Sequence, residues 1–169
     1  GVQDASSLLR VTAALSRQRG WDPNPVVVAL RASTEDLAGE LSKQEFASEP
    51  TTHFGVGLAL GTERSALIVL LARRRMELAP FPRTHPKPVV RQRLCGVLVD
   101  PLDSAELFVT RPHGAVERVS MPPVGKFRCA TLAFNTAGRH AVEVLAAGPR
   151  GPEVAALFFV DVGAVRAEE

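Results

Sequence analysis

The sequence contains little of what metal, redox or membrane chemistry requires. Its 169 residues include two cysteines, one tryptophan, four histidines and no tyrosine. The longest uninterrupted apolar run, residues 66–72, is far shorter than the roughly 20 residues needed to cross a bilayer. We therefore expect no membrane span.

Neither sign of charge dominates. The chain has 20 Lys and Arg against 18 Asp and Glu, which leaves a formal net charge of +2. Such a balance provides no polycationic surface, so we expect no nucleic-acid partner. A hydrophobic fraction of 46% with 22% charged residues is typical of a folded globular chain.

The common catalytic motifs are missing. The chain has no nucleophile elbow, no phosphate-binding loop and no zinc-protease motif. Zinc ligands usually come in closely spaced pairs, whereas the histidines here are scattered along the sequence. We predict no catalytic residue, no metal site and no cofactor. The histidines concerned are His53, His85, His113 and His140.

The first half predicts helices and strands together. One stretch repeats its apolar residues at helical spacing, and a second begins on a capping-box pattern. Three short apolar runs are too brief for helices and predict strands, two of them joined as a hairpin. Because these runs are continuously apolar, we expect both faces of the hairpin to be covered within a small α/β unit, residues 1–80. The predicted elements are helices at 6–20 and after 33–36, and strands at 26–30, 53–60 and 65–72.

The second half predicts strands alone. Closely spaced prolines indicate a stiff linker over residues 81–90. Beyond it, short strands recur at the spacing of an immunoglobulin-like β-sandwich, which we assign to residues 91–169. The predicted fold class is therefore α+β, a small α/β unit followed by an all-β sandwich.

Cys95 and Cys129 both fall within predicted strands of the sandwich. A disulfide between them would contribute about 3–4 kcal/mol through loop entropy and would indicate an oxidising compartment. The alternative is a pair of buried free thiols in a cytosolic protein. We predict the disulfide, because both cysteines lie in one predicted domain and no metal or nucleophilic role is available for them.

Arg73, Arg74 and Arg75 form a basic cluster after a predicted strand. Clusters of this kind usually face solvent at the end of a strand. The functional alternative is a contact with an anion or with a protein partner.

One segment resembles a known family. Residues 48–59, Ser-Glu-Pro-Thr-Thr-His-Phe-Gly-Val-Gly-Leu-Ala, follow a predicted helix and lead into an apolar strand. This stretch resembles the closing part of CAP domains, the family of cysteine-rich secretory and pathogenesis-related proteins. Bacterial members of myxobacterial type are similar in carrying a β-sandwich afterwards. The resemblance covers residues 6–78 and implies a partial, degenerate CAP unit.

The resemblance also bears on one candidate residue. CAP members that bind a divalent metal use two histidines with acidic partners in one cleft. The first unit of this chain has a single histidine, His53. The resemblance therefore implies that His53 is at most a remnant of that cleft, without a bound metal.

Three functional hypotheses follow. The first is a non-catalytic, extracytoplasmic binding or interaction module that is secreted, periplasmic or at the cell surface, with an unknown protein or cell-surface ligand as partner. The second is a fragment of a CAP-like hydrolase or metal-dependent enzyme. The third is a structural spacer domain of a larger surface protein. Since no signal-type segment opens the sequence, we expect any targeting segment to have been removed or to lie upstream of Gly1.

Overall fold

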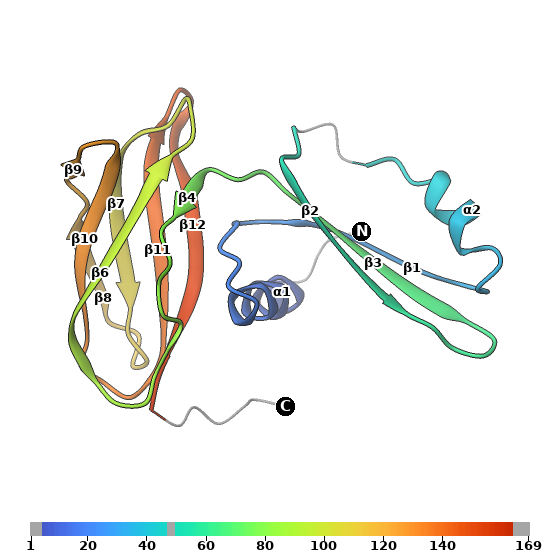
Figure 1. The fold of residues 1–169 in the computed structure, drawn as a ribbon, viewed down its shortest axis with the longest axis horizontal. Coiled ribbons are helices and arrows are strands. Elements are labelled where there is room, and N and C mark those ends of the chain that lie inside the picture. Colours follow the sequence, from blue (N-terminus) through green and yellow to red (C-terminus); the bar gives the residue numbers. More distant parts are fainter. Residues whose placement is uncertain (1–4, 47–49, 164–169) are drawn as a thin grey trace. The chain divides into compact units, whose positions relative to one another are not determined.

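The computed structural model describes residues 5–46 and 50–163 and divides the chain into two compact units (Figure 1). The larger unit combines Gly1–Pro23 with Arg75–Glu169, and the smaller unit is Asn24–Arg74. Within the described residues, the chain forms two helices and twelve strands in three sheets. The predicted α+β class is therefore wrong. The protein is essentially all-β, and its described residues form no α/β unit of the CAP type.

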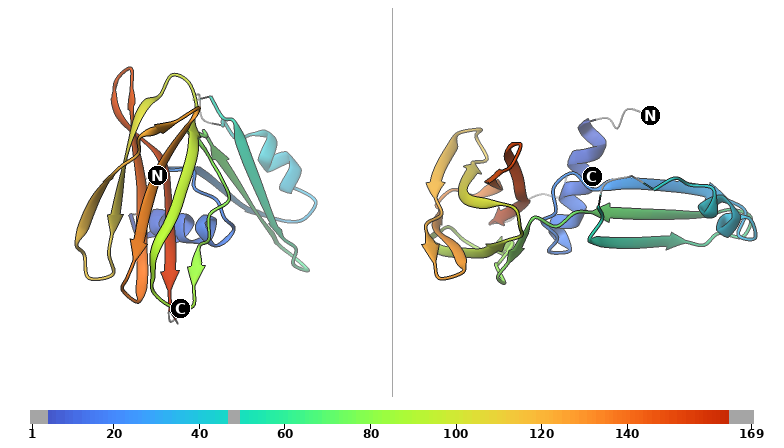
Figure 2. Two further views of the ribbon diagram at one scale, coloured as in Figure 1. Left: turned by 60° about the vertical axis from the view of Figure 1, so that its left-hand side comes forward. Right: turned by 90° about the horizontal axis from the view of Figure 1, so that it is seen from above.

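The larger unit contains two facing sheets, so the predicted β-sandwich is confirmed (Figure 2). Neighbouring strands are antiparallel except for β5, which runs parallel to β12. One sheet has the order β4-β6-β10-β9, with bounds Met76–Leu78, Val89–Leu98, Phe127–Phe134 and Pro123–Val124. The other has the order β5-β12-β11-β7-β8, with bounds Thr84–His85, Gly151–Val162, Gly138–Gly148, Asp103–Thr110 and Val116–Ser120.

Alternating side chains from both sheets fill the interior of the sandwich. Along β11, Val142, Val144 and Ala146 are buried, and the residues between them are half-buried. This period of two arises because successive side chains of a strand point to opposite faces. Burying each Leu, Phe, Val or Met side chain stabilises the fold by about 1.5–3 kcal/mol. The largest fully buried side chains include Met76, Leu94, Leu107, Leu132, Phe134 and Phe158.

Helix α1, Ala5–Arg17, packs on β12 of the larger unit. Ser16 is 4% exposed, and its Oγ donates a hydrogen bond to the Phe159 carbonyl at 3.1 Å and accepts one from the Phe159 amide at 2.8 Å. The helix ends where the Gly20 amide donates to the Leu15 carbonyl at 2.7 Å. A Cβ at position 20 would lie 3.1 Å from that oxygen, which favours glycine there.

The two units differ from the predicted division into residues 1–80, 81–90 and 91–169. The first helix joins the sandwich, and the predicted linker is part of the sandwich as well. Phe81 lies in its core, and β5 pairs with β12. Periodicity identified the helix, but it carries no information about which sheet the apolar face of a helix covers.

The smaller unit is a three-stranded antiparallel sheet in the order β1-β3-β2. The predicted hairpin is confirmed, since β2 and β3 pair along their lengths. Helix α2 packs against β1 and begins where the Ser33 Oγ accepts the Asp36 amide at 3.2 Å. Neither α1 nor α2, the helices of the described residues, is long and apolar enough to cross a membrane. The bounds are β1 Val26–Ala32, α2 Leu37–Ser42, β2 His53–Ala59 and β3 Ser65–Ala72.

Candidate interaction surface

One face of the smaller sheet is apolar in every strand. Directly paired residues of an antiparallel sheet point to the same side, so the register places three rows of side chains on this face. We name it the apolar face. Its rows are Val26 with Leu71 and Phe54, Val28 with Val69 and Val56, and Leu30 with Leu67 and Leu58.

The apolar face is buried at its centre and exposed along β2. Leu67 and Val69 of the central strand are 7% and 8% exposed, whereas Phe54, Val56 and Leu58 are 77%, 60% and 56% exposed. The expectation that both faces of the hairpin are covered is therefore wrong. Exposed apolar residues that gather in one patch commonly mark an interaction site.

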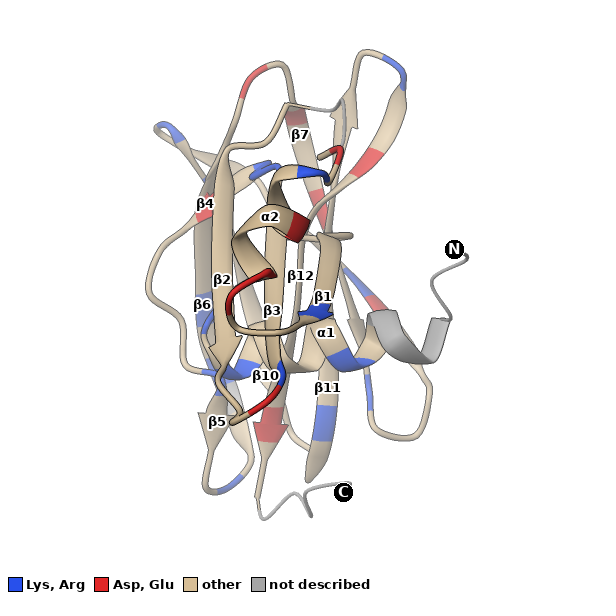
Figure 3. Ribbon diagram, turned by 90° about the vertical axis from the view of Figure 1, so that its right-hand side faces the viewer, with Lys and Arg blue, Asp and Glu red and all other residues tan. Residues whose placement is uncertain are grey.

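Strand β2 is also an unprotected edge of its sheet. In the part of the chain that the structure describes, β2 pairs with β3 alone, so its outer side offers amide and carbonyl groups to a further strand. It contains none of the Lys, Pro, Asp or Glu residues that commonly block such edges. Figure 3 shows β2 without charged residues along its length. The other edge strand, β1, carries Arg31 and packs against α2. The open edge of the sheet is β2.

Two glycines leave the middle of β2 without side chains on the opposite face. A Cβ at Gly55 or Gly57 would meet no atom of the described residues within 4 Å. Because Phe54, Val56 and Leu58 alternate with these glycines, β2 presents its large apolar side chains on the apolar face alone. These three residues were not predicted as a candidate surface from the sequence. The signal was present in the alternation of glycine with large apolar residues, but the segment was interpreted as a continuous apolar run.

His53 lies at the start of β2 and is exposed. Its Nδ1 is 3.0 Å from the Oγ1 of Thr52, which also accepts the Arg74 amide at 2.7 Å. His53 therefore takes part in a hydrogen-bond network at the strand end. Among the described residues, no three His, Cys, Asp or Glu side chains are grouped to hold a metal. The role of His53 as a remnant of a cleft stays a prediction.

The three arginines of the predicted cluster are divided between the units. Arg73 and Arg74 belong to the smaller unit, just past β3, and Arg75 belongs to the larger one. Arg75 forms an ion pair of 2.5 Å with Glu153 of β12, and the two side chains are 13% and 21% exposed. Arg75 is thus engaged within the larger unit. The contact of the cluster with an anion or partner stays a prediction.

The predicted disulfide is present in the larger unit. Cys95 of β6 and Cys129 of β10 lie directly opposite each other in the sheet, and their sulfur atoms are bonded. The bond joins neighbouring strands of one sheet. Disulfides persist in oxidising compartments, which is consistent with a location outside the cytoplasm.

The resemblance of residues 6–78 to CAP domains stays a prediction. No protein-family model matches the chain, and no curated protein is significantly similar to it.

Proposed function

We propose that this protein is an interaction module that acts outside the cytoplasm and assembles with a second copy of itself through β2. The observation that carries the proposal is the exposure of all seven β2 residues on an open strand edge. Pairing with an added strand supplies main-chain hydrogen bonds, and the side chains of the apolar face supply buried apolar area. The disulfide supports the proposed location.

Strand β2 is complementary to itself in the antiparallel direction. Pairing centred on Val56 would place Val56 opposite its copy and Phe54 opposite Leu58 of the second chain. Gly55 would then face Gly57, so apolar residues meet apolar residues and glycine meets glycine. A shift by one residue would set Phe54 against Gly57 and lose these contacts. The same residues take part in both copies, as a two-fold symmetric dimer requires.

No fixed charge opposes this pairing. Like charges facing each other across two strands destabilise a sheet, and β2 contains no Lys, Arg, Asp or Glu. His53 would lie opposite Ala59 of the second chain in the same register. Both apolar faces would then lie on one side of a continuous sheet, in the order β1-β3-β2-β2-β3-β1.

Sedimentation velocity of the full chain tests the proposal. We expect a dimer at micromolar concentrations that dissociates on dilution. The substitution Val56→Lys places two ammonium groups opposite each other at the centre of the paired register, so it should give a monomer. Ile68→Lys is the matched control, because Ile68 is 46% exposed on the central strand and points to the opposite face. This control variant should remain dimeric.

Two results would contradict the proposal. One is a wild-type chain that stays monomeric over the whole concentration range, as expected of a spacer domain. The other is a Val56→Lys variant that dimerises as strongly as the wild type. Thermal unfolding of both lysine variants shows whether the folded unit survives the substitution, and the comparison is made between variants that remain folded. If Val56→Lys unfolds the unit, Val56→Thr provides a milder loss of apolar area at the same position.

A further inference from the structure

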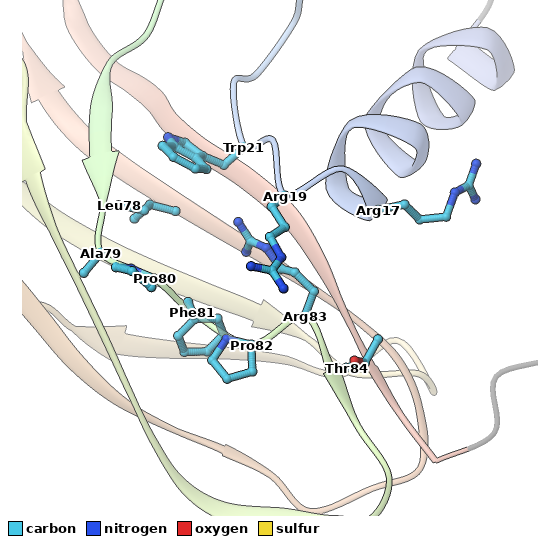
Figure 4. A pocket seen from close by; sticks show the side chains of 10 residues that line it. All are labelled: Arg17, Arg19, Trp21, Leu78, Ala79, Pro80, Phe81, Pro82, Arg83 and Thr84. Carbon is cyan, nitrogen blue, oxygen red and sulfur yellow. The ribbon is translucent and has the colours of Figure 1, made fainter.

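The larger unit contains a cavity of about 730 Å³ that is lined by basic and aromatic side chains (Figure 4). Its walls come from two segments far apart in the sequence, residues 17–21 at the end of α1 and residues 78–84. Cavities of this size commonly hold small molecules. Neither segment was identified as a site from the sequence.

Arg83 is the residue of this cavity that points most directly to a ligand. Its Nε and Nη1 atoms are buried and have no hydrogen-bond partner among the residues that the structure describes. The guanidinium carbon lies 3.5 Å from the centre of the Phe158 ring. Stacking on a ring stabilises a cation but provides no acceptor in the plane of the guanidinium, where its N–H groups point. A buried charged donor without an acceptor is costly, so this position favours an anionic ligand.

Arg19 brings a second positive charge to the same cavity. Figure 4 shows its side chain next to that of Arg83. Burial first, and then the charge of Arg19, lowers the pKa of Arg83 to about 10. Among the described residues, the ion pairs involve neither arginine. Two neighbouring cations of this kind are stabilised when an oxyanion accepts hydrogen bonds from both.

A carboxylate near this cavity is already matched by another arginine. Asp161 lines an adjoining hollow of about 310 Å³, which Arg83 also lines. Its carboxylate accepts hydrogen bonds from Arg139 at 2.9 and 3.3 Å. Arg139 therefore neutralises Asp161, and the charges of Arg19 and Arg83 remain available to a ligand in the larger cavity.

The apolar side of the cavity is held in place by the sandwich. Trp21 Nε1 donates a hydrogen bond to the Met76 carbonyl at 2.7 Å, and the Trp21 carbonyl accepts one from the Leu157 amide at 2.9 Å. The rings of Phe81 and Phe158 have their centres 5.9 Å apart. A wall that is already ordered lowers the entropic cost of binding. It suits an apolar or aromatic group beside the anion.

We propose that this cavity binds a small molecule in which an oxyanion, a carboxylate or a phosphate ester, adjoins an apolar or aromatic group. The oxyanion accepts hydrogen bonds from Arg19 and Arg83, and the apolar group lies against Trp21 and Phe81. The site lies wholly within the larger unit. A negative binding result at this cavity would therefore leave the proposed pairing through β2 unaffected.

Trp21 gives a direct signal for the test, because it is the single tryptophan of a chain without tyrosine. The full chain is titrated with phenyl phosphate and with benzoate while the Trp21 fluorescence is recorded. We expect a saturable change with at least one of them, at a Kd of about 1 mM or tighter, and the stronger binder identifies the preferred oxyanion. Inorganic phosphate, which lacks the apolar group, should bind more weakly, and neutral benzyl alcohol should give no saturable change.

Charge-removing variants locate the site. Arg19→Gln and Arg83→Gln should each weaken binding by about tenfold or more, because each removes a charged hydrogen-bond donor. Arg150→Gln removes an exposed charge from the turn between β11 and β12 and should leave the affinity unchanged. If Arg83→Gln does not fold, the affinity of the Arg19→Gln variant decides the result, because Arg19 is exposed. Absence of a saturable change with both anions, or an Arg19→Gln variant with wild-type affinity, would overturn the proposal.

Discussion

Removal of the Cys95–Cys129 disulfide should destabilise the larger unit by an amount that follows from its loop length. The two cysteines are 34 positions apart in the sequence. The bond restricts the unfolded chain, and the loop-entropy relation for this separation gives about 3.8 kcal/mol at 25 °C. The bond joins strands that are already paired in one sheet, so the folded state needs no rearrangement when the bond is absent.

The double variant Cys95→Ala with Cys129→Ala provides the perturbation, and urea unfolding provides the assay. Trp21 fluorescence reports on the larger unit alone, since Trp21 packs against the core of the sandwich. With a denaturant slope of about 2 kcal/mol per molar, the midpoint should fall by about 2 M urea. Dithiothreitol should lower the wild-type midpoint similarly and leave the double variant unchanged, which controls for effects of the reductant.

Two results would refute this reasoning. A midpoint that changes by less than about 0.3 M would show that the bond does not restrict the unfolded chain as the entropy model requires. Two reactive thiols in the denatured, unreduced wild type would show that the bond is absent, and would remove an argument for an extracytoplasmic location. Thiol titration therefore precedes the unfolding experiment.

Three further predictions concern the larger unit. Burial lowers the pKa of His140, which is fully buried. Below the ordinary histidine pKa of 6.5, the unfolded chain therefore takes up a proton at this residue while the folded state resists it, so the stability should fall between pH 7 and pH 5. A His140→Leu variant should show a smaller fall in Tm over that range. An equal fall in both proteins would exclude His140 as the cause. Ser16→Ala leaves the partly buried amide and carbonyl of Phe159 without their side-chain partner, and should lower the unfolding free energy measured in urea by about 1–3 kcal/mol. A loss below about 0.5 kcal/mol would show that water replaces the hydroxyl. Gly96→Ala would place a Cβ 2.9 Å from the Glu77 carbonyl oxygen, and should lower the unfolding free energy by about 1–3 kcal/mol; an unchanged midpoint would show that β4 moves without cost.

Local patterns in the sequence were sufficient to predict most of the helices and strands. The helical repeat corresponds to α1, the hairpin to β2 and β3, and the evenly spaced runs of the second half to strands of a sandwich. The position of the two cysteines within those runs was sufficient to predict the disulfide. These features depend on residues close together in the chain or on alternation within one strand. Either pattern can be recognised without knowing which other element packs against it.

The assignment of elements to units and the composition of both candidate sites depended on tertiary structure. An apolar helix face shows that a helix is covered, but it does not show which sheet covers it, so α1 could be assigned to the sandwich only from its contact with β12. Exposure of β2 follows from its place at the edge of the sheet, which strand order decides and composition does not. Arg19 and Arg83 share a cavity because the segment after α1 lies beside the stretch before β5, and no pattern within a single sequence records such a long-range approach.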